Sequence, residues 1–140
     1  MEIVKAWEET GAKIPAPYAR PIKVLFAPDK GNVPELTFSF ALIDSGGQTD
    51  YHAHDRPELI YVVFGRGESL CEGEIVPVQA DVIMWVRAGK RHQLKNTGAE
   101  TLKLATVFVP AYTAASNYRR CLEAALKLGG SAEQQGAAGA

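Results

Sequence analysis

Hydrophobic and polar residues alternate along much of the first 110 positions of the chain. The clearest case is residues 36–42, where four large apolar residues alternate with Thr37, Ser39 and Ala41. A period of two residues is typical of a β-strand with one buried face, because successive side chains of a strand point to opposite sides. Further alternating or apolar runs predict strands at residues 22–27, 48–54, 58–64, 68–72, 75–78, 82–86, 91–96 and 101–109.

Turn-forming residues separate these runs at short intervals. Glycine, proline, asparagine and aspartate recur between them, as in residues 28–34 after the first predicted strand and residues 96–100 before the last. These residue types favour tight turns and loops. Many short strands joined by short turns, with no helix between them, are typical of an all-β sandwich or barrel. We therefore expect one β-barrel domain over residues 22–112.

The two ends of the chain have different patterns. Residues 1–21 contain three prolines and a glycine, which favours an extended arm. On this arm Trp7 either covers the edge of the core or reaches a second subunit, and we expect the first. Residues 113–129 have apolar side chains at spacings of three and four and predict one amphipathic helix. Residues 130–140 lack core-forming side chains and are expected to be disordered.

Composition limits the classes of function. The 140 residues suffice for a single core, and the formal net charge of −1 leaves no basic excess for binding nucleic acid. No apolar run approaches the ~20 residues of a membrane span, and the first residues lack the apolar core of a signal peptide. We expect a cytoplasmic protein without a membrane partner, in which Cys71 and Cys121 are free thiols.

One stretch, residues 46–65, has the pattern of a metal site. His52 and His54 are separated by one residue, so in an extended chain their side chains point to the same side. A turn follows, and Glu58 begins the next apolar run, so a returning strand would bring Glu58 beside the pair. His92 is the only other histidine of the sequence and is the candidate for a fourth ligand. Imidazole and carboxylate groups are ligands of divalent metals.

The spacing of these residues resembles the two sequence motifs of the cupins. The first motif is a glycine, five residues, His-x-His, three residues, a glutamate, six residues and a glycine, and it matches Gly46, His52, His54, Glu58 and Gly65. The second motif is matched in part, by Gly89, His92 and Asn96. Its first glycine and its proline are replaced by Asp81 and Arg87, and neither change removes a ligand.

The resemblance covers roughly residues 36–110 and implies a fold, a metal site and an assembly. The fold would be a double-stranded β-helix, or jelly-roll barrel, followed here by one C-terminal α-helix. The implied ligands of one divalent transition metal are His52, His54, Glu58 and His92. Iron, manganese, nickel, zinc, cobalt and copper all suit such ligands, and ligand type does not choose among them. A homodimer is expected as well, and the arm with Trp7 and the edge strands of a jelly roll favour it.

Other residues are weaker candidates for contacts with a small-molecule substrate. Tyr61 and Trp85 could stack on it, although aromatic residues in strands also serve as core. Arg87 and Arg91 flank the segment of His92 and could attract an anion, and a solvated turn is the alternative. Asn96 either orients a metal ligand or forms a turn.

Three functions are compatible with such a site. Three imidazoles and one carboxylate leave coordination positions open, which favours an enzyme acting on a small oxygen-containing substrate, neutral or anionic. The cupin resemblance favours dioxygenase-type chemistry, with a metal-dependent isomerase or lyase as the alternative. A non-catalytic module that binds a sugar or an acid is the second function, and a metal that only stabilises the barrel is the third.

Overall fold

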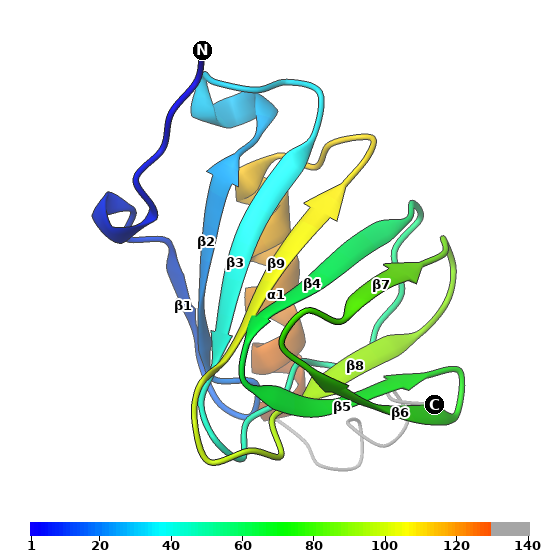
Figure 1. Cartoon of the computed structure of the whole chain (residues 1–140). Coiled ribbons are helices and arrows are strands. Elements are labelled where there is room, and N and C mark those ends of the chain that lie inside the picture. The colour runs from blue at the N-terminus through cyan, green and yellow to red at the C-terminus, as the bar shows by residue number, and fades with distance from the viewer. Residues whose placement is uncertain (130–140) are drawn as a thin grey trace.

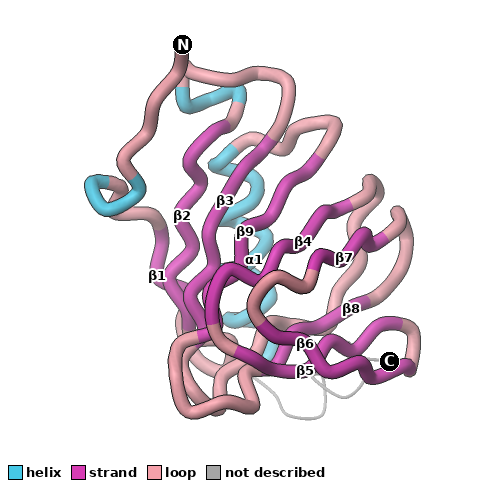
Figure 2. Tube along the Cα trace, viewed as in Figure 1, coloured by secondary structure: helices cyan, strands magenta, loops and turns pink. Residues whose placement is uncertain are grey.

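Two antiparallel sheets and one C-terminal helix make up the fold (Figure 1, Figure 2). The structure is a computed structural model and describes residues 1–129. The strand order is β1-β2-β3-β9-β4-β7 in the larger sheet and β6-β5-β8 in the smaller one. The strands are β1 (Ala12–Ile14), β2 (Arg20–Phe26), β3 (Thr37–Ile43), β4 (Glu58–Phe64), β5 (Arg66–Cys71), β6 (Glu74–Gln79), β7 (Ile83–Val86), β8 (His92–Lys95) and β9 (Leu102–Phe108).

Helix α1 (Ala114–Gly129) follows the last strand, and two short 3-10 helices, η1 (Ala6–Glu8) and η2 (Pro28–Lys30), lie near the N-terminus. The predicted all-β fold with one C-terminal helix is confirmed. None of the helices within residues 1–129 has the length and apolar character needed to cross a membrane. The predicted disordered tail, residues 130–140, lies outside the described residues.

In strand β3, the face with the smaller, polar side chains is buried, and the face with the phenylalanines is not. Thr37 and Ser39 are buried, whereas Phe38 and Phe40 are only half-buried on the outer side of the sheet. The two phenylalanine rings pack against each other there, with their centroids 5.6 Å apart. The physical reason is that the inner face of β3 borders a cavity, which small and polar side chains leave open.

Residues 48–54 do not form the predicted strand. They run antiparallel to β8 and make isolated bridges, from Gln48 to Lys95 and from His52 to His92. At the second bridge, the amide of His52 donates to the carbonyl of His92 (3.1 Å) and the amide of His92 donates in return (2.8 Å). Although the pairing is interrupted, these two hydrogen bonds hold His52 directly opposite His92.

Helix α1 packs on the inner side of the larger sheet and lies behind β2, β3 and β9 in Figure 1. Its buried residues are Ala114, Asn117, Cys121 and Ala125, at helical spacings of three and four. The expected helical pattern is thus confirmed, but Leu126, four residues after Leu122 and apolar, is 67% exposed. The helix closes the side of the barrel that the smaller sheet leaves open.

The N-terminal arm is tied to the barrel. Residues 12–14 form β1, which pairs with β2 at the edge of the larger sheet. Ile14 and Tyr18 are buried against Cys121 and Ala125 of the helix. Trp7, however, is 78% exposed, so the expectation that it covers the edge of the core is wrong for this single chain.

The backbone conformation explains the residue types at two motif positions, Gly65 and Asp81. Gly65 has φ of +88°, and a Cβ atom there would lie 2.5 Å from the carbonyl oxygen of Thr101, so only glycine fits. Asp81, which stands in place of a motif glycine, has φ of +73°. Aspartate tolerates this left-handed conformation better than most residues, which accounts for the substitution.

Candidate metal centre

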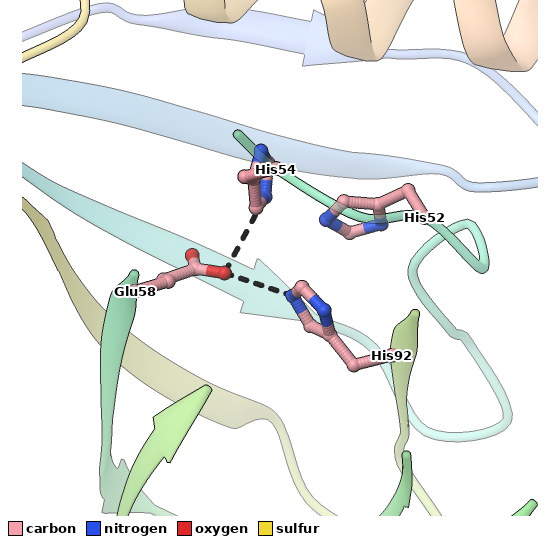
Figure 3. Close-up of side chains that lie close together, drawn as sticks. All are labelled: His52, His54, Glu58 and His92. Carbon is pink, nitrogen blue, oxygen red and sulfur yellow. Dashed lines mark hydrogen bonds and ion pairs between the residues drawn. The ribbon is translucent and has the colours of Figure 1, made fainter. Parts of the chain in front are cut away.

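The structure brings the four predicted ligand residues together (Figure 3). His52 and His54 lie in the segment between β3 and β4, whereas Glu58 and His92 are the first residues of β4 and β8. One ligand atom from each residue lies within 4.8 Å of all the others. Three separate segments of the barrel therefore supply one compact group of nitrogen and oxygen donors.

Glu58 is at the centre of the group. Its Oε1 atom lies 2.9 Å from Nε2 of His92 and 3.5 Å from Nε2 of His54. The ring of His52 lies beside those of His54 and His92, with centroid distances of 4.6 and 4.5 Å. The three rings and the carboxylate thus face one small volume (Figure 3).

Backbone hydrogen bonds orient two of the rings. Nδ1 of His52 lies 2.8 Å from the carbonyl oxygen of Asp50, and Nδ1 of His92 lies 3.0 Å from that of Lys90. A carbonyl oxygen only accepts hydrogen bonds, so Nδ1 must donate in both rings. In the neutral imidazole, Nε2 then keeps its lone pair and points into the group, as a metal ligand requires.

His54 has a buried nitrogen, Nε2, that makes no hydrogen bond within the described part of the chain, although Oε1 of Glu58 lies 3.5 Å away. The ring is packed edge to face against Phe108, with centroids 4.7 Å apart. A buried polar atom without a hydrogen bond costs free energy, and a metal ion bound at this atom would remove that cost. The residues present therefore fit a divalent metal.

The ionisation states favour a negative carboxylate and one basic histidine. Burial opposes ionisation of Glu58, but the contacts of its carboxylate with His54 and His92 outweigh burial and lower its pKa to about 2. Burial, together with nearby positive charges, holds the pKa of His52 well below its usual value. Burial also opposes protonation of His92, yet its contact with Glu58 raises its pKa. A metal ion must therefore displace a proton from His92.

An inner cavity of about 60 Å³ is lined by three of the four residues, His52, Glu58 and His92. Ser39 and Thr106 line one wall, and their hydroxyls share a 2.6 Å hydrogen bond. Apolar residues, among them Ile60 and Phe108, line the wall beside them. A small molecule in this cavity would contact both polar and apolar groups next to the metal site.

Four cavity residues were missed by the sequence analysis: Arg20 of β2, and Asn117, Arg120 and Cys121 of α1. Arginine and asparagine on an amphipathic helix normally face solvent, so nothing in their type marked them. The signal was the spacing of the helix, because Asn117 and Cys121 lie four residues apart on its buried face.

The predicted substrate residues lie elsewhere. Tyr61 and Trp85 point to the outer side of the sheet, since their neighbours Ile60 and Val86 point inward. Trp85 is 54% exposed, and the hydroxyl of Tyr61 donates to Asp81. Arg87 is exposed and, like Trp85 and Tyr61, does not border the inner cavity.

Arg91 and Asn96 also lie away from the inner cavity. The guanidinium of Arg91 lies over the ring of Tyr51, 4.8 Å from its centroid. The side-chain amide of Asn96 donates to the carbonyls of Ile43 and Glu100, and its oxygen accepts from the amide of Gly98. Asn96 therefore acts as a turn former, the alternative that sequence reasoning left open.

An all-β barrel with three histidines and one glutamate around one point defines a class, the small β-barrel proteins with a candidate mononuclear metal site. A family model described as the cupin domain matches residues 39–109, just over half of the 140 positions. The chain belongs to the cupin family, and the jelly-roll fold expected from the motifs is confirmed. Among curated proteins, no match was found.

Solved structures with the same fold include proteins whose names describe different activities. A predicted oxalate decarboxylase from Thermotoga maritima is 21% identical, with a TM-score of 0.70 over 78% of this chain and 99% of that one. The ectoine synthase of P. lautus is 19% identical, with a TM-score of 0.70 over 86% of both chains. The polyketide cyclase RemF of Streptomyces resistomycificus is 18% identical, with a TM-score of 0.66 over 78% and 79%. Similarity at this level establishes the fold and does not transfer an activity.

Proposed function

We propose that the protein is a metal-dependent enzyme that acts on a small oxygen-containing substrate at one ion held by His52, His54, Glu58 and His92. The observation that carries the proposal is the buried Nε2 of His54, which makes no hydrogen bond within residues 1–129 although it lies among the donor atoms of three other residues. A site built only for hydrogen bonding would not leave this atom unsatisfied.

The bound ion would act as a Lewis acid and orient an oxygen atom of the substrate. The chain's own residues prepare this chemistry. Asp50 and Lys90 hold two imidazole rings in the tautomer that binds metal through Nε2. Glu58 supplies one negative charge, which reduces the net charge of the centre. Phe108 covers one side of His54 and limits the access of water.

Dioxygenase-type chemistry remains the favoured reaction on the cupin motifs, and it requires a redox-active ion such as iron. The second candidate is a non-oxidative isomerase or lyase, which the names of the similar structures support, since they include a predicted oxalate decarboxylase and a polyketide cyclase. Oxygen consumption in the presence of small enolic, catecholic or 2-hydroxy acids separates these two. Uptake supports the oxygenase, and substrate conversion without uptake supports the isomerase or lyase.

Metal analysis is the first test of the site. The protein, purified without a metal-affinity column, is expected to contain about one divalent ion per chain, and His92→Ala should lose it. Arg87→Ala is the matched control, because Arg87 is exposed and away from the cavity, and it should retain the ion. Full retention of metal in His92→Ala would overturn the ligand assignment.

A binding module without catalysis is the alternative function. It shares the metal site, so metal content does not distinguish it from an enzyme. If the metal-loaded protein binds small acids or sugars reversibly and converts none of the acids tested above, the enzyme proposal fails. If removal of metal lowers the melting temperature and no ligand binding exists to be lost, the ion only stabilises the barrel.

A homodimer remains our proposal for the assembly. It is supported by apolar side chains on the outer side of β4 and β7, where Val63, Ile83 and Trp85 are exposed. Apolar patches of this kind are commonly covered by a second subunit. A monomeric mass in light scattering at micromolar concentration would contradict the proposal.

The partners and location are proposed on similar grounds. The two cysteines, Cys71 and Cys121, are free, which supports a reducing compartment such as the cytoplasm. The net charge of −1 supports small-molecule ligands rather than nucleic acid. Fractionation of cells that express the tagged protein tests the location.

A further inference from the structure

Two arginines that lie outside the turn expected to bind anions border the inner cavity. Arg20 comes from β2 and Arg120 from α1, and both border the cavity that adjoins the candidate metal site. Between them lies Asp50, which is buried. Nη1 of Arg120 donates to Oδ2 of Asp50 at 3.1 Å, and Nη2 of Arg20 lies 3.6 Å from Oδ1 of the same carboxylate.

This group of side chains has more positive than negative charge. Arg20 and Arg120 contribute two positive charges, and Asp50 supplies one negative charge. Cys121 also contacts both arginines, at 3.8 and 3.1 Å, but burial raises the pKa of its thiol, so it adds no negative charge. Among the described residues, Asp50 is the one carboxylate within ion-pair distance of the two arginines, while Glu58 of the same cavity contacts His54 and His92. The arginine pair therefore has one positive charge more than its carboxylate partner, in a partly buried place where it attracts an anion.

Arg120 also has an unused donor. Its Nη1 and Nη2 atoms donate to Asp50 and Cys121, whereas its buried Nε has no hydrogen-bond partner among residues 1–129. Arg20 is committed more fully, because it also donates to the carbonyl of Tyr18 at 2.9 Å and its side chain is only 4% exposed. The side chain of Arg120 is 32% exposed, so a ligand from solution can reach it.

The position of Arg120 connects the surface with the metal site. Tyr112, Ser116, Asn117 and Arg120 line a hollow of about 210 Å³ at the surface. Asn117 and Arg120 also line the inner cavity, together with His52, Glu58 and His92. Arg120 is therefore in reach of a molecule in either space, the surface hollow or the cavity beside the candidate metal ligands.

We propose that Arg120 binds the carboxylate of a small organic acid in the cavity, and that a second oxygen of the same acid reaches the metal. Asn117 is the neighbouring polar group at the junction of the two spaces, and Arg20 positions Arg120 through Asp50. The second half of this proposal rests on the proposed function, because it needs a metal ion at the four ligand residues. The first half, the binding of a carboxylate at Arg120, does not.

Three other arginines, Arg56, Arg87 and Arg91, are poorer candidates for binding the carboxylate. Arg87 is exposed outside the cavity, and Arg91 lies over Tyr51. Arg56 stacks on the ring of Tyr112, 3.8 Å from its centroid, and donates to the carbonyl of Ala111 at 2.7 Å. Only Arg20 and Arg120, among the arginines of the described chain, border the inner cavity.

The test measures binding of lactate and of lactamide to the full chain by calorimetry, with and without metal. The two probes have nearly the same size and the same hydroxyl group, and only lactate carries a carboxylate. We expect lactate to bind the metal-loaded protein in the millimolar range or tighter, and lactamide to bind at least about 10-fold more weakly, because a charge-assisted hydrogen bond is lost.

Two variants of the same helix locate the carboxylate site. Arg120→Gln should weaken lactate binding about 10- to 100-fold and bring it to the level of lactamide, while Arg120→Lys should restore part of the loss. Asp50 keeps Arg20 as a partner in both variants, so the fold is expected to persist. Arg119→Gln is the matched control, since Arg119 is exposed on the same helix, and it should bind like the unchanged protein.

Metal content is measured on every variant, so that the two proposals fail separately. If Arg120→Gln keeps its metal and binds lactate as tightly as the unchanged protein, the carboxylate site is overturned and the metal site stands. If no variant contains metal but lactate binding still depends on Arg120, the proposed function fails and the carboxylate site is supported. If acetate, lactate, oxalate and malonate all fail to bind the metal-loaded protein at millimolar concentration, the carboxylate site is also overturned.

Discussion

The interior of the barrel has two ends that differ in chemistry although the same strands build both. At one end, Ile43, Val62 and Leu102 pack into an apolar cluster with almost no exposed surface. At the other end, the inward residues of these strands are Ser39, Glu58 and Thr106, which border the cavity and the metal site. Each strand therefore stabilises the fold with one half and forms the site with the other.

The comparison explains how a small barrel keeps a polar cavity. Buried polar groups cost free energy unless they are paired, and the tightly packed apolar end offsets that cost. The site can then change in sequence without loss of the fold, provided that the apolar end is kept. Five predictions test this separation of the two ends, from the largest expected effect to the smallest.

The largest effect is expected for metal retention in His54→Ala. The variant loses one of four ligands, and metal affinity should fall by at least about 100-fold. The metal-free variant should unfold close to the metal-free parent, since the substitution also removes the unpartnered buried nitrogen of His54. Elemental analysis and thermal melting measure the two quantities. A variant that keeps its metal but loses its fold would refute the separation of the two ends.

The reverse result is expected at the apolar end. Leu102→Ala removes a fully buried side chain from the cluster and should lower the free energy of unfolding by about 2 to 5 kcal/mol. Its metal content at low temperature should be unchanged. Leu126→Ala is the control, because Leu126 is exposed, and its effect should stay within about 0.5 kcal/mol. Urea unfolding of the metal-free parent and of both variants gives the free energies of unfolding, and elemental analysis gives the metal content.

The third prediction concerns the pH dependence of metal binding. The raised pKa of His92 means that the metal displaces a proton from this ring. Affinity should therefore fall about tenfold per pH unit once the pH drops below that pKa, and more steeply when further imidazoles protonate. Competition with a chelator across about pH 5.5 to 7.5 measures the slope. A flat profile would mean that His92 is not a ligand.

The stability of the metal-free protein should also depend on pH, through Glu58 and His52. The folded-state pKa of Glu58 is about 2, below its ordinary value, so its ionised form stabilises the fold at neutral pH. That contribution should be lost as the pH falls from about 4.5 towards about 2. His52, whose pKa is lowered in the folded state, should destabilise the protein below about pH 6.5, because the unfolded chain then binds the proton more tightly.

The smallest effect is expected for the hydroxyl pair in the cavity wall. Thr106→Val leaves the hydroxyl of Ser39 without its 2.6 Å partner and should lower the free energy of unfolding by about 1 kcal/mol. The double variant with Ser39→Ala should recover part of this loss, since no hydroxyl is left unpaired. Additive effects in urea unfolding would show that the two hydroxyls do not interact.

Much of the fold and the four-residue cluster could be read from local patterns. His52 and His54 are two positions apart, so local geometry alone puts them on one side, and Glu58 follows after one turn. Residues 48–54 do not form the regular strand that was predicted. The isolated bridge between His52 and His92 nevertheless places His52 beside His92, as a strand would. Local sequence determines direction well because it depends on a few adjacent dihedral angles.

The residues that sequence reasoning misplaced are those whose role depends on distant neighbours. Phe38 and Trp85 look like core residues by type, but they lie on the outer side of the sheet. Arg120 looks like a solvent-facing residue of a helix, and it borders the cavity because α1 docks with this side turned inward. Residue type gives a preference for burial, and packing can override it.

By itself, the sequence determined the class of fold, the punctuation between the strands and the group of three histidines and one glutamate. These depend on strand and turn preferences and on ligand spacing, which act over a few residues. The tertiary structure alone decided which face of β3 turns inward, where the cavity lies, and that Arg20 and Arg120 meet at Asp50 across 100 positions of sequence. Contacts between distant segments depend on how whole elements pack, and no local pattern encodes that arrangement.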